Sequence, residues 1–87
     1  SEEGNVLVDG SANLRELTRR LDLALPTDGP KTLNGLIIEY LQDIPEAGVS
    51  MKIADTPIEV VQTQDRMIRT ARLFRPLAPT QAERNGP

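Results

Sequence analysis

The chain has 87 residues, with 10 basic and 13 acidic side chains and neither cysteine nor histidine. A chain of this length forms one small domain, which buries only about 60% of the surface that its unfolded form exposes. Its net charge of −3 gives no electrostatic basis for nucleic-acid binding, which is typical of basic domains. Without cysteine and histidine, disulfides, zinc sites and most nucleophilic catalysis are excluded. No apolar stretch approaches the roughly 20 residues that span a bilayer, so we expect a soluble polypeptide that does not insert into a membrane.

The first predicted strand is the short apolar run from Asn5 to Val8, which ends at the turn dipeptide Asp9-Gly10. The polar residues 1–4 that precede it are expected to be disordered. A helix follows, because Asn13 is typical of an N-cap and Glu16 completes the pattern of a capping box. Its buried face is predicted from an i, i+3, i+7 repeat of leucines, namely Leu14, Leu17 and Leu21.

A second helix is predicted from its N-cap Thr32 to about Gln42. Its broad apolar face makes it the expected centre of the core: Leu33, Leu36, Ile37, Tyr40, Leu41 and Ile44. Pro45 and Gly48 prevent the helix from continuing. Gly35 lies inside this helix, where glycine costs about 1 kcal/mol relative to alanine, so we expect another backbone to approach closely there.

Beyond Val49 the apolar period changes to two, which predicts three strands. The turns between them are expected at Asp55-Thr56-Pro57 and at Gln64-Asp65. In the last strand we expect Met67, Arg69, Ala71 and Leu73 to share one face, and Ile68 does not fit this alternation.

The predicted fold is α+β, with two helices packed on a small, mainly antiparallel sheet of about four strands in the order β-α-α-β-β-β. The domain is expected to cover residues 5–75. Residues 76–87 are rich in proline and polar side chains and are predicted to be disordered.

Seven acidic side chains fall in loops or at the ends of elements, where solvated carboxylates are expected: Asp9, Asp22, Asp28, Asp43, Glu46, Asp55 and Asp65. We predict no catalytic pair among them and no metal site, since no loop has EF-hand spacing. The glycines are too scattered for a phosphate-binding loop. Gly10 and Gly48 are interpreted as turn residues that adopt positive φ.

Four arginines form the basic cluster of the sequence: Arg66, Arg69, Arg72 and Arg75. A spacing of three sends successive side chains of a strand to opposite faces, so no single stripe is expected. We interpret them as residues that keep an edge strand solvated, which discourages aggregation. A contact with another domain or with anionic lipid headgroups is the alternative.

Five motifs together resemble the CorC/HlyC transporter-associated domain, which lies at the carboxyl end of CorC, hemolysin-like and cyclin M-type membrane proteins. They are Val8-Asp9-Gly10, Leu14 with Leu17, Thr32-Leu33-Asn34-Gly35-Leu36, Ile44-Pro45-Glu46-Ala47-Gly48 and Ile58-Glu59-Val60. The similarity covers about residues 5 to 73. Two positions depart from the family pattern: Ile58 stands where an aromatic residue is common, and Val49 stands where an acid is usual.

The resemblance implies a fold similar to a subdomain of FAD-binding oxidases of the vanillyl-alcohol type. It also implies a parent protein with CBS domains, linked to magnesium and cobalt transport or efflux. We therefore expect a non-catalytic regulatory domain on the cytoplasmic side of the inner membrane, without cofactor or catalytic residues. It would contact CBS or transmembrane domains of the same polypeptide, or its own copy, near Arg66 to Arg75. A flavin or adenine-nucleotide binding module and a divalent-cation sensor are the alternatives, with FAD supported by fold similarity only.

Overall fold

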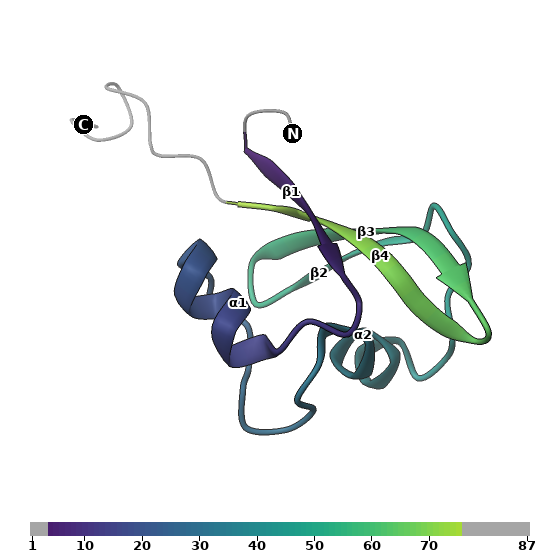
Figure 1. Cartoon of the computed structure of the whole chain (residues 1–87), viewed down its shortest axis with the longest axis horizontal. Helices are drawn as coiled ribbons and strands as arrows, with labels where there is room; N and C mark the ends of the chain where they lie inside the picture. The colour runs from purple at the N-terminus through teal and green to yellow at the C-terminus, as the bar shows by residue number, and fades with distance from the viewer. Residues whose placement is uncertain (1–3, 76–87) are drawn as a thin grey trace.

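The structure, a computed structural model, describes residues 4–75 (Figure 1). Its elements follow the predicted order: β1 (Asn5–Asp9), α1 (Leu14–Leu21), α2 (Leu33–Leu41), β2 (Ser50–Ile53), β3 (Thr56–Gln64) and β4 (Met67–Phe74). Of the two ends predicted to be disordered, residues 1–3 and 76–87 lie outside the described range. Gly4 is described, and its carbonyl oxygen accepts a hydrogen bond from the N–H of Arg75 at 2.8 Å.

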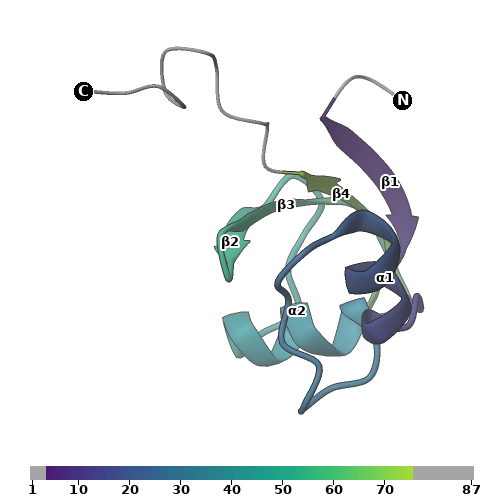
Figure 2. The same cartoon turned by 90° about the vertical axis from the view of Figure 1, so that its left-hand side faces the viewer.

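The four strands form one antiparallel sheet in the order β1-β4-β3-β2. The predicted meander of β2, β3 and β4 is present, and β1 pairs with β4, the last strand of the meander. Both helices lie on the same side of this sheet (Figure 2). The sheet therefore has a covered face, which packs against the helices, and an open face on the opposite side. The α+β prediction is confirmed.

The core lies between the helices and the covered face, and apolar side chains build it: Leu14, Leu17, Leu25, Leu33, Leu36, Ile37, Ile53, Ile58, Val60, Ile68, Ala71 and Leu73. Within α2 the predicted face is buried at its first three members. Tyr40 was also predicted to be buried, and this was wrong, because its side chain is 53% exposed. It lies in the last turn of α2, where a phenol keeps its polar tip in water.

Both helices have the predicted N-caps. Asn13 Oδ1 accepts a hydrogen bond from the Glu16 N–H at 3.0 Å, and Thr32 Oγ1 accepts one from the Gly35 N–H at 3.1 Å. Each bond satisfies an N–H group that the helix itself leaves without a partner. α2 ends at Gln42, which adopts the left-handed conformation with φ of 60°. The second helix therefore has the predicted bounds.

The first hairpin turn lies at Ala54 and Asp55, with φ of 49° and 66°. The turn predicted at Asp55-Thr56-Pro57 is present but lies earlier in the chain, because Thr56 and Pro57 are already the first residues of β3. Proline is tolerated there because the β3–β4 ladder begins one residue later, at Ile58. Two consecutive residues with positive φ give the twist that suits a two-residue hairpin.

The second hairpin turn lies at Asp65 and Arg66, with φ of 55° and 65°, one residue later than predicted. Along β3 and β4 the register shifts between the partners of Val60 and of Thr63. This irregularity reverses the phase of the buried side chains in β4. Ile68 is consequently buried and Met67 is exposed, so the predicted phase was wrong at this end of the strand.

Candidate interaction surface

The structure does not bring the four arginines of the sequence cluster together as one stripe. Arg66 lies in the second hairpin turn, and Arg69 lies at the register shift of β4. Arg75 follows the end of β4 and is exposed. The interpretation of these residues as guards of an edge strand was wrong, because β4 lies between β1 and β3. Edge positions belong to β1 and β2, so the arginines cannot protect a free edge.

Arg72 is the member of the cluster with a defined partner. Its Nη1 donates to Glu59 Oε1 at 2.9 Å, and the two residues are directly opposite each other on β4 and β3. The side chains are about one third exposed, at 35% and 34%, so solvent screens the pair and it contributes only about 0–1 kcal/mol. Leu7 of β1 lies opposite Arg72 on its other side and is 51% exposed. The open face thus combines an ion pair with an exposed aliphatic side chain.

The Asp9-Gly10 motif forms a tight corner after β1. Asp9 Oδ1 accepts hydrogen bonds from the Ser11 N–H at 2.8 Å and from Ser11 Oγ at 2.7 Å. The backbone hydrogen bond from Ser11 is the main cause that lowers the pKa of Asp9, with smaller contributions from the Ser11 hydroxyl and the charge of Arg69. The carboxylate therefore stabilises the turn and is not poised for acid–base chemistry.

The sequence suggested that Gly10 adopts a positive φ, but Gly10 is required here for close packing instead. A Cβ at this position would lie 1.8 Å from the carbonyl oxygen of Ile68 in β4. The close backbone approach that was predicted at Gly35 therefore occurs at Gly10. A Cβ at Gly35 would meet side-chain atoms instead, Pro30 Cβ at 3.2 Å and Thr32 Oγ1 at 3.3 Å. The predictions of positive φ at Gly10 and of a close backbone approach at Gly35 were therefore wrong.

Gly48, in contrast, has the predicted positive φ, at 96°.

Asn34 joins the corner to the sheet, and sequence reasoning missed it. Its N–H donates to the Gly10 carbonyl oxygen at 2.7 Å, and its Oδ1 accepts a hydrogen bond from the Ile68 N–H at 2.8 Å. The first turn of α2 is thereby tied to the end of β1 and the start of β4. The available signal was a short amide side chain among apolar neighbours in the first turn of a helix, a place where such groups bond to nearby backbone.

The remaining motif residues serve the fold. Leu33, Leu36 and Val60 are buried in the core, and Pro45 is buried within the segment that connects α2 with β2. Ile44 is partly buried beside it. These residues therefore account for the family pattern through packing and turn geometry.

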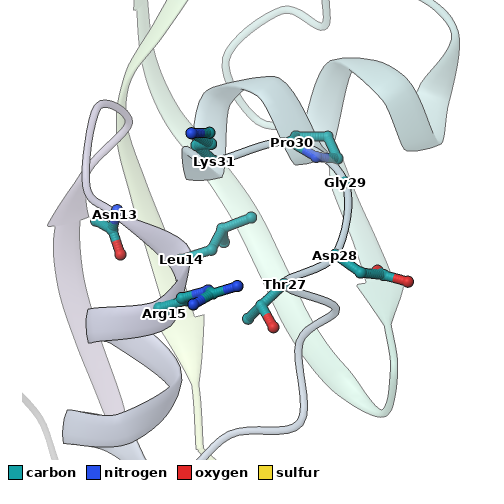
Figure 3. Close-up of a pocket in the computed structure, with 8 residues that line it drawn as sticks. All are labelled: Asn13, Leu14, Arg15, Thr27, Asp28, Gly29, Pro30 and Lys31. Atoms are coloured by element: carbon teal, nitrogen blue, oxygen red, sulfur yellow. The ribbon is translucent and has the colours of Figure 1, made fainter.

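A hollow of about 420 Å³ lies between the start of α1 and the loop that leads to α2 (Figure 3). Arg15 extends toward this loop, whereas Asp28 points away from the hollow. The N–H groups at the start of α1 are mostly engaged: Leu14 N–H donates to the Lys31 carbonyl oxygen at 2.9 Å, and Glu16 N–H donates to Asn13. The helix terminus therefore has little left to offer an anion.

Within residues 4–75 no three or more acidic side chains come close enough to hold a metal ion. The loop acids of the sequence are separated by the fold, as Asp22 after α1 and Asp55 in the first hairpin turn illustrate. In the same part of the chain, no helix has the length and apolar character needed to cross a bilayer.

The chain is a small α+β module whose sheet has one face covered by helices and one open face. Gly10, Asn34 and Ile68 form the junction that joins β1, α2 and β4. Residues 1–76 match the model of the CorC_HlyC family, the transporter-associated domain. The chain belongs to this family.

Among its relatives, the UPF0053 inner membrane protein YfjD of Escherichia coli K12 is 39% identical over 83 residues, which cover 93% of this chain and 19% of the relative. The chain thus spans about a fifth of the length of that protein. A conserved protein of unknown function from Haemophilus influenzae Rd KW20 has a TM-score of 0.82 at 36% identity, with 86% of this chain and 93% of the other covered.

Two further solved structures have the same fold. A transporter-associated domain from a Xylella fastidiosa hemolysin, in complex with Mg²⁺ and Mn²⁺, has a TM-score of 0.77 at 30% identity and covers 88% of this chain and 94% of the other. The transporter-associated domain of a CBS domain protein from Porphyromonas gingivalis has a TM-score of 0.73 at 26% identity, with coverage of 85% and 91%.

Proposed function

We propose that this chain is the non-catalytic regulatory domain of an inner membrane protein that transports or exports divalent cations such as magnesium and cobalt. In this proposal the domain lies on the cytoplasmic side and acts by contact with CBS or transmembrane domains of the same polypeptide. The membership in the transporter-associated family carries the proposal. Two relatives add support, namely an inner membrane protein and a homologous domain within a CBS domain protein.

The geometry favours a role in contact over a role in chemistry. The core is aliphatic, and the motif residues serve turns and packing. Side chains available to a partner include those of the open face, where Leu7 is half exposed and Arg72 is held by Glu59, and Tyr40 near the end of α2. A contact with these side chains differs between two arrangements of the neighbouring domains. Such a difference in contact shifts the equilibrium between the two arrangements.

The experiment that tests this proposal compares transport by the full-length protein with and without residues 5–75, over a range of external magnesium concentrations. We expect the response to magnesium to change while the transporter remains inserted in the membrane. Identical transport with and without the domain at every concentration would contradict a regulatory role.

A divalent-cation sensor is the second candidate, because the Xylella domain was solved in complex with Mg²⁺ and Mn²⁺. A ligand that binds only the folded state raises the melting temperature. A rise that grows with millimolar Mg²⁺ or Mn²⁺, and that Na⁺ at equal ionic strength does not reproduce, would support this candidate. An unchanged melting temperature would oppose it.

A further inference from the structure

The two edge strands of the sheet differ in how they face solvent. In the sheet of residues 4–75, β1 is bordered by β4 alone and β2 by β3 alone. β2 has only four residues and carries Lys52, which is exposed and directly opposite Pro57. Short length and lysine are devices that discourage pairing at an edge. β1 has five residues, with neither lysine nor proline, and an apolar centre formed by Val6, Leu7 and Val8. Its edge therefore has fewer obstacles to an added strand.

The hydrogen bonds at the two ends of β1 show which of its backbone groups face outward. Arg75 N–H donates to the Gly4 carbonyl oxygen, and Gly10 N–H donates to the Arg69 carbonyl oxygen at 2.9 Å. Backbone groups alternate in direction along an antiparallel strand, so the even-numbered residues of β1 face β4. The N–H groups of Asn5, Leu7 and Asp9 consequently point away from the sheet.

These outward groups belong to a strand that is nearly symmetric about Leu7. Its neighbours on both sides are valines, Val6 and Val8, and the ends are Asn5 and Asp9, which can pair as amide and carboxylate. Two antiparallel copies centred on Leu7 would place valine opposite valine and Asn5 opposite Asp9. The two exposed Leu7 side chains would then face each other on the open face. The strand is therefore complementary to an antiparallel copy of itself.

We propose that β1 pairs with β1 of a second copy of this chain, antiparallel and centred on Leu7. The result is a continuous eight-stranded sheet with twofold symmetry, whose helices all lie on one face. This inference deepens the proposed function, on which it rests, by naming the partner as the domain's own copy. The pairing involves a single short strand from each copy, so we expect weak association in solution. In a membrane protein, where two copies are held near each other, the high effective concentration strengthens such a contact.

The test measures self-association of the chain from micromolar to millimolar concentration, by sedimentation and by amide hydrogen exchange. We expect protection of the Asn5, Leu7 and Asp9 amides to rise with concentration, while Ser50 and Lys52 of β2 stay unchanged. Association without protection of the β1 amides would overturn the proposal. So would the absence of association at millimolar concentration, or protection at Leu7 that does not depend on concentration, since the latter places another part of the same chain on the edge.

Leu7→Lys places two positive charges opposite each other across the twofold axis, and we expect it to weaken association by about tenfold. Tyr40→Lys is the matched control, because Tyr40 has nearly the same exposed fraction as Leu7, 53% against 51%, but lies in α2. Equal association of the two variants would overturn the proposal. The amide exchange of the unsubstituted chain decides the question if Leu7→Lys fails to fold. These results are independent of the transport assay, so the proposed self-association and the proposed regulatory role can be contradicted separately.

Discussion

The two faces of the sheet differ in their exposure to solvent, although the same strands form both. On the covered face, Ile58, Val60 and Leu73 are nearly inaccessible and pack against the helices. On the open face, Leu7 is half exposed and the pair of Arg72 with Glu59 is partly hydrated. Burial gives the first set its large contribution to stability, whereas solvent screens the second set. The covered face therefore stabilises the module, while the open face and its edge are available for contact.

The largest expected effect is loss of an apolar side chain beneath the covered face. Leu33→Ala removes a side chain with no exposed surface, so we expect the free energy of unfolding to fall by about 2–5 kcal/mol. Leu7→Ala, on the open face, is the matched control and should cost much less. Urea denaturation measures both. Equal losses of unfolding free energy in the two variants would contradict the proposed difference between the faces.

The next effect concerns the corner that joins β1 to the helical layer. Gly10→Ala inserts a Cβ against the Ile68 carbonyl oxygen, so the backbone must shift, and we expect a loss of about 1–3 kcal/mol. Gly29→Ala is the control, because the nearest atom to its added Cβ would be Glu39 Oε1 at 3.9 Å. Thermal denaturation of the two variants should separate them clearly, and a stability of Gly10→Ala equal to that of the unsubstituted chain would contradict the observed packing.

The Asn34 side chain, at the same junction, is expected to have an effect of similar size. Asn34→Ala leaves the partly buried Ile68 N–H without its acceptor, at a cost of about 1–3 kcal/mol. Asn34→Asp keeps an oxygen acceptor at the same position and should retain more stability. Denaturation curves for the pair, with amide exchange at Ile68, report this bond. If alanine and aspartate were equivalent, the hydrogen bond would not be the cause.

The smallest effect belongs to the exposed carboxylate of Asp9. Its folded pKa is lowered from 3.8, mainly by the Ser11 backbone N–H, so the carboxylate contributes stability above the unfolded pKa. This contribution is lost as the pH falls through the lower, folded pKa. Asp9→Asn should remove this part of the pH dependence and leave the curve near neutral pH similar in shape. An unaltered acid limb in the variant would show that another group is responsible.

Local signals made the element order and both helices predictable. Asn13 and Thr32 act as caps through contacts within three residues, and leucine spacing identifies a buried helical face without knowledge of its partner. The hairpin turns were placed less well, because Pro57 was read as a turn former although its position in β3 requires no N–H toward β4.

The junction could not be predicted because it depends on segments far apart in the chain. Asn34 and Ile68 are separated by 34 positions, and Gly10 meets the same strand only after the sheet has formed. The edge position of β1 follows from its pairing with β4, which the sequence pattern does not specify. The sequence predicted a contact near Arg66 to Arg75, around a strand that lies inside the sheet, whereas the free edges of the described sheet are β1 and β2.

We propose that the module works by contact through the β1 edge and not through its stabilising face. The most direct measurement is transport by the full-length protein carrying Leu7→Lys, after the domain has been shown to retain its melting temperature. We predict that its response to magnesium changes in the same direction as when residues 5–75 are removed. A response identical to that of the unsubstituted protein, alongside a clear effect of removing the domain, would contradict the claim.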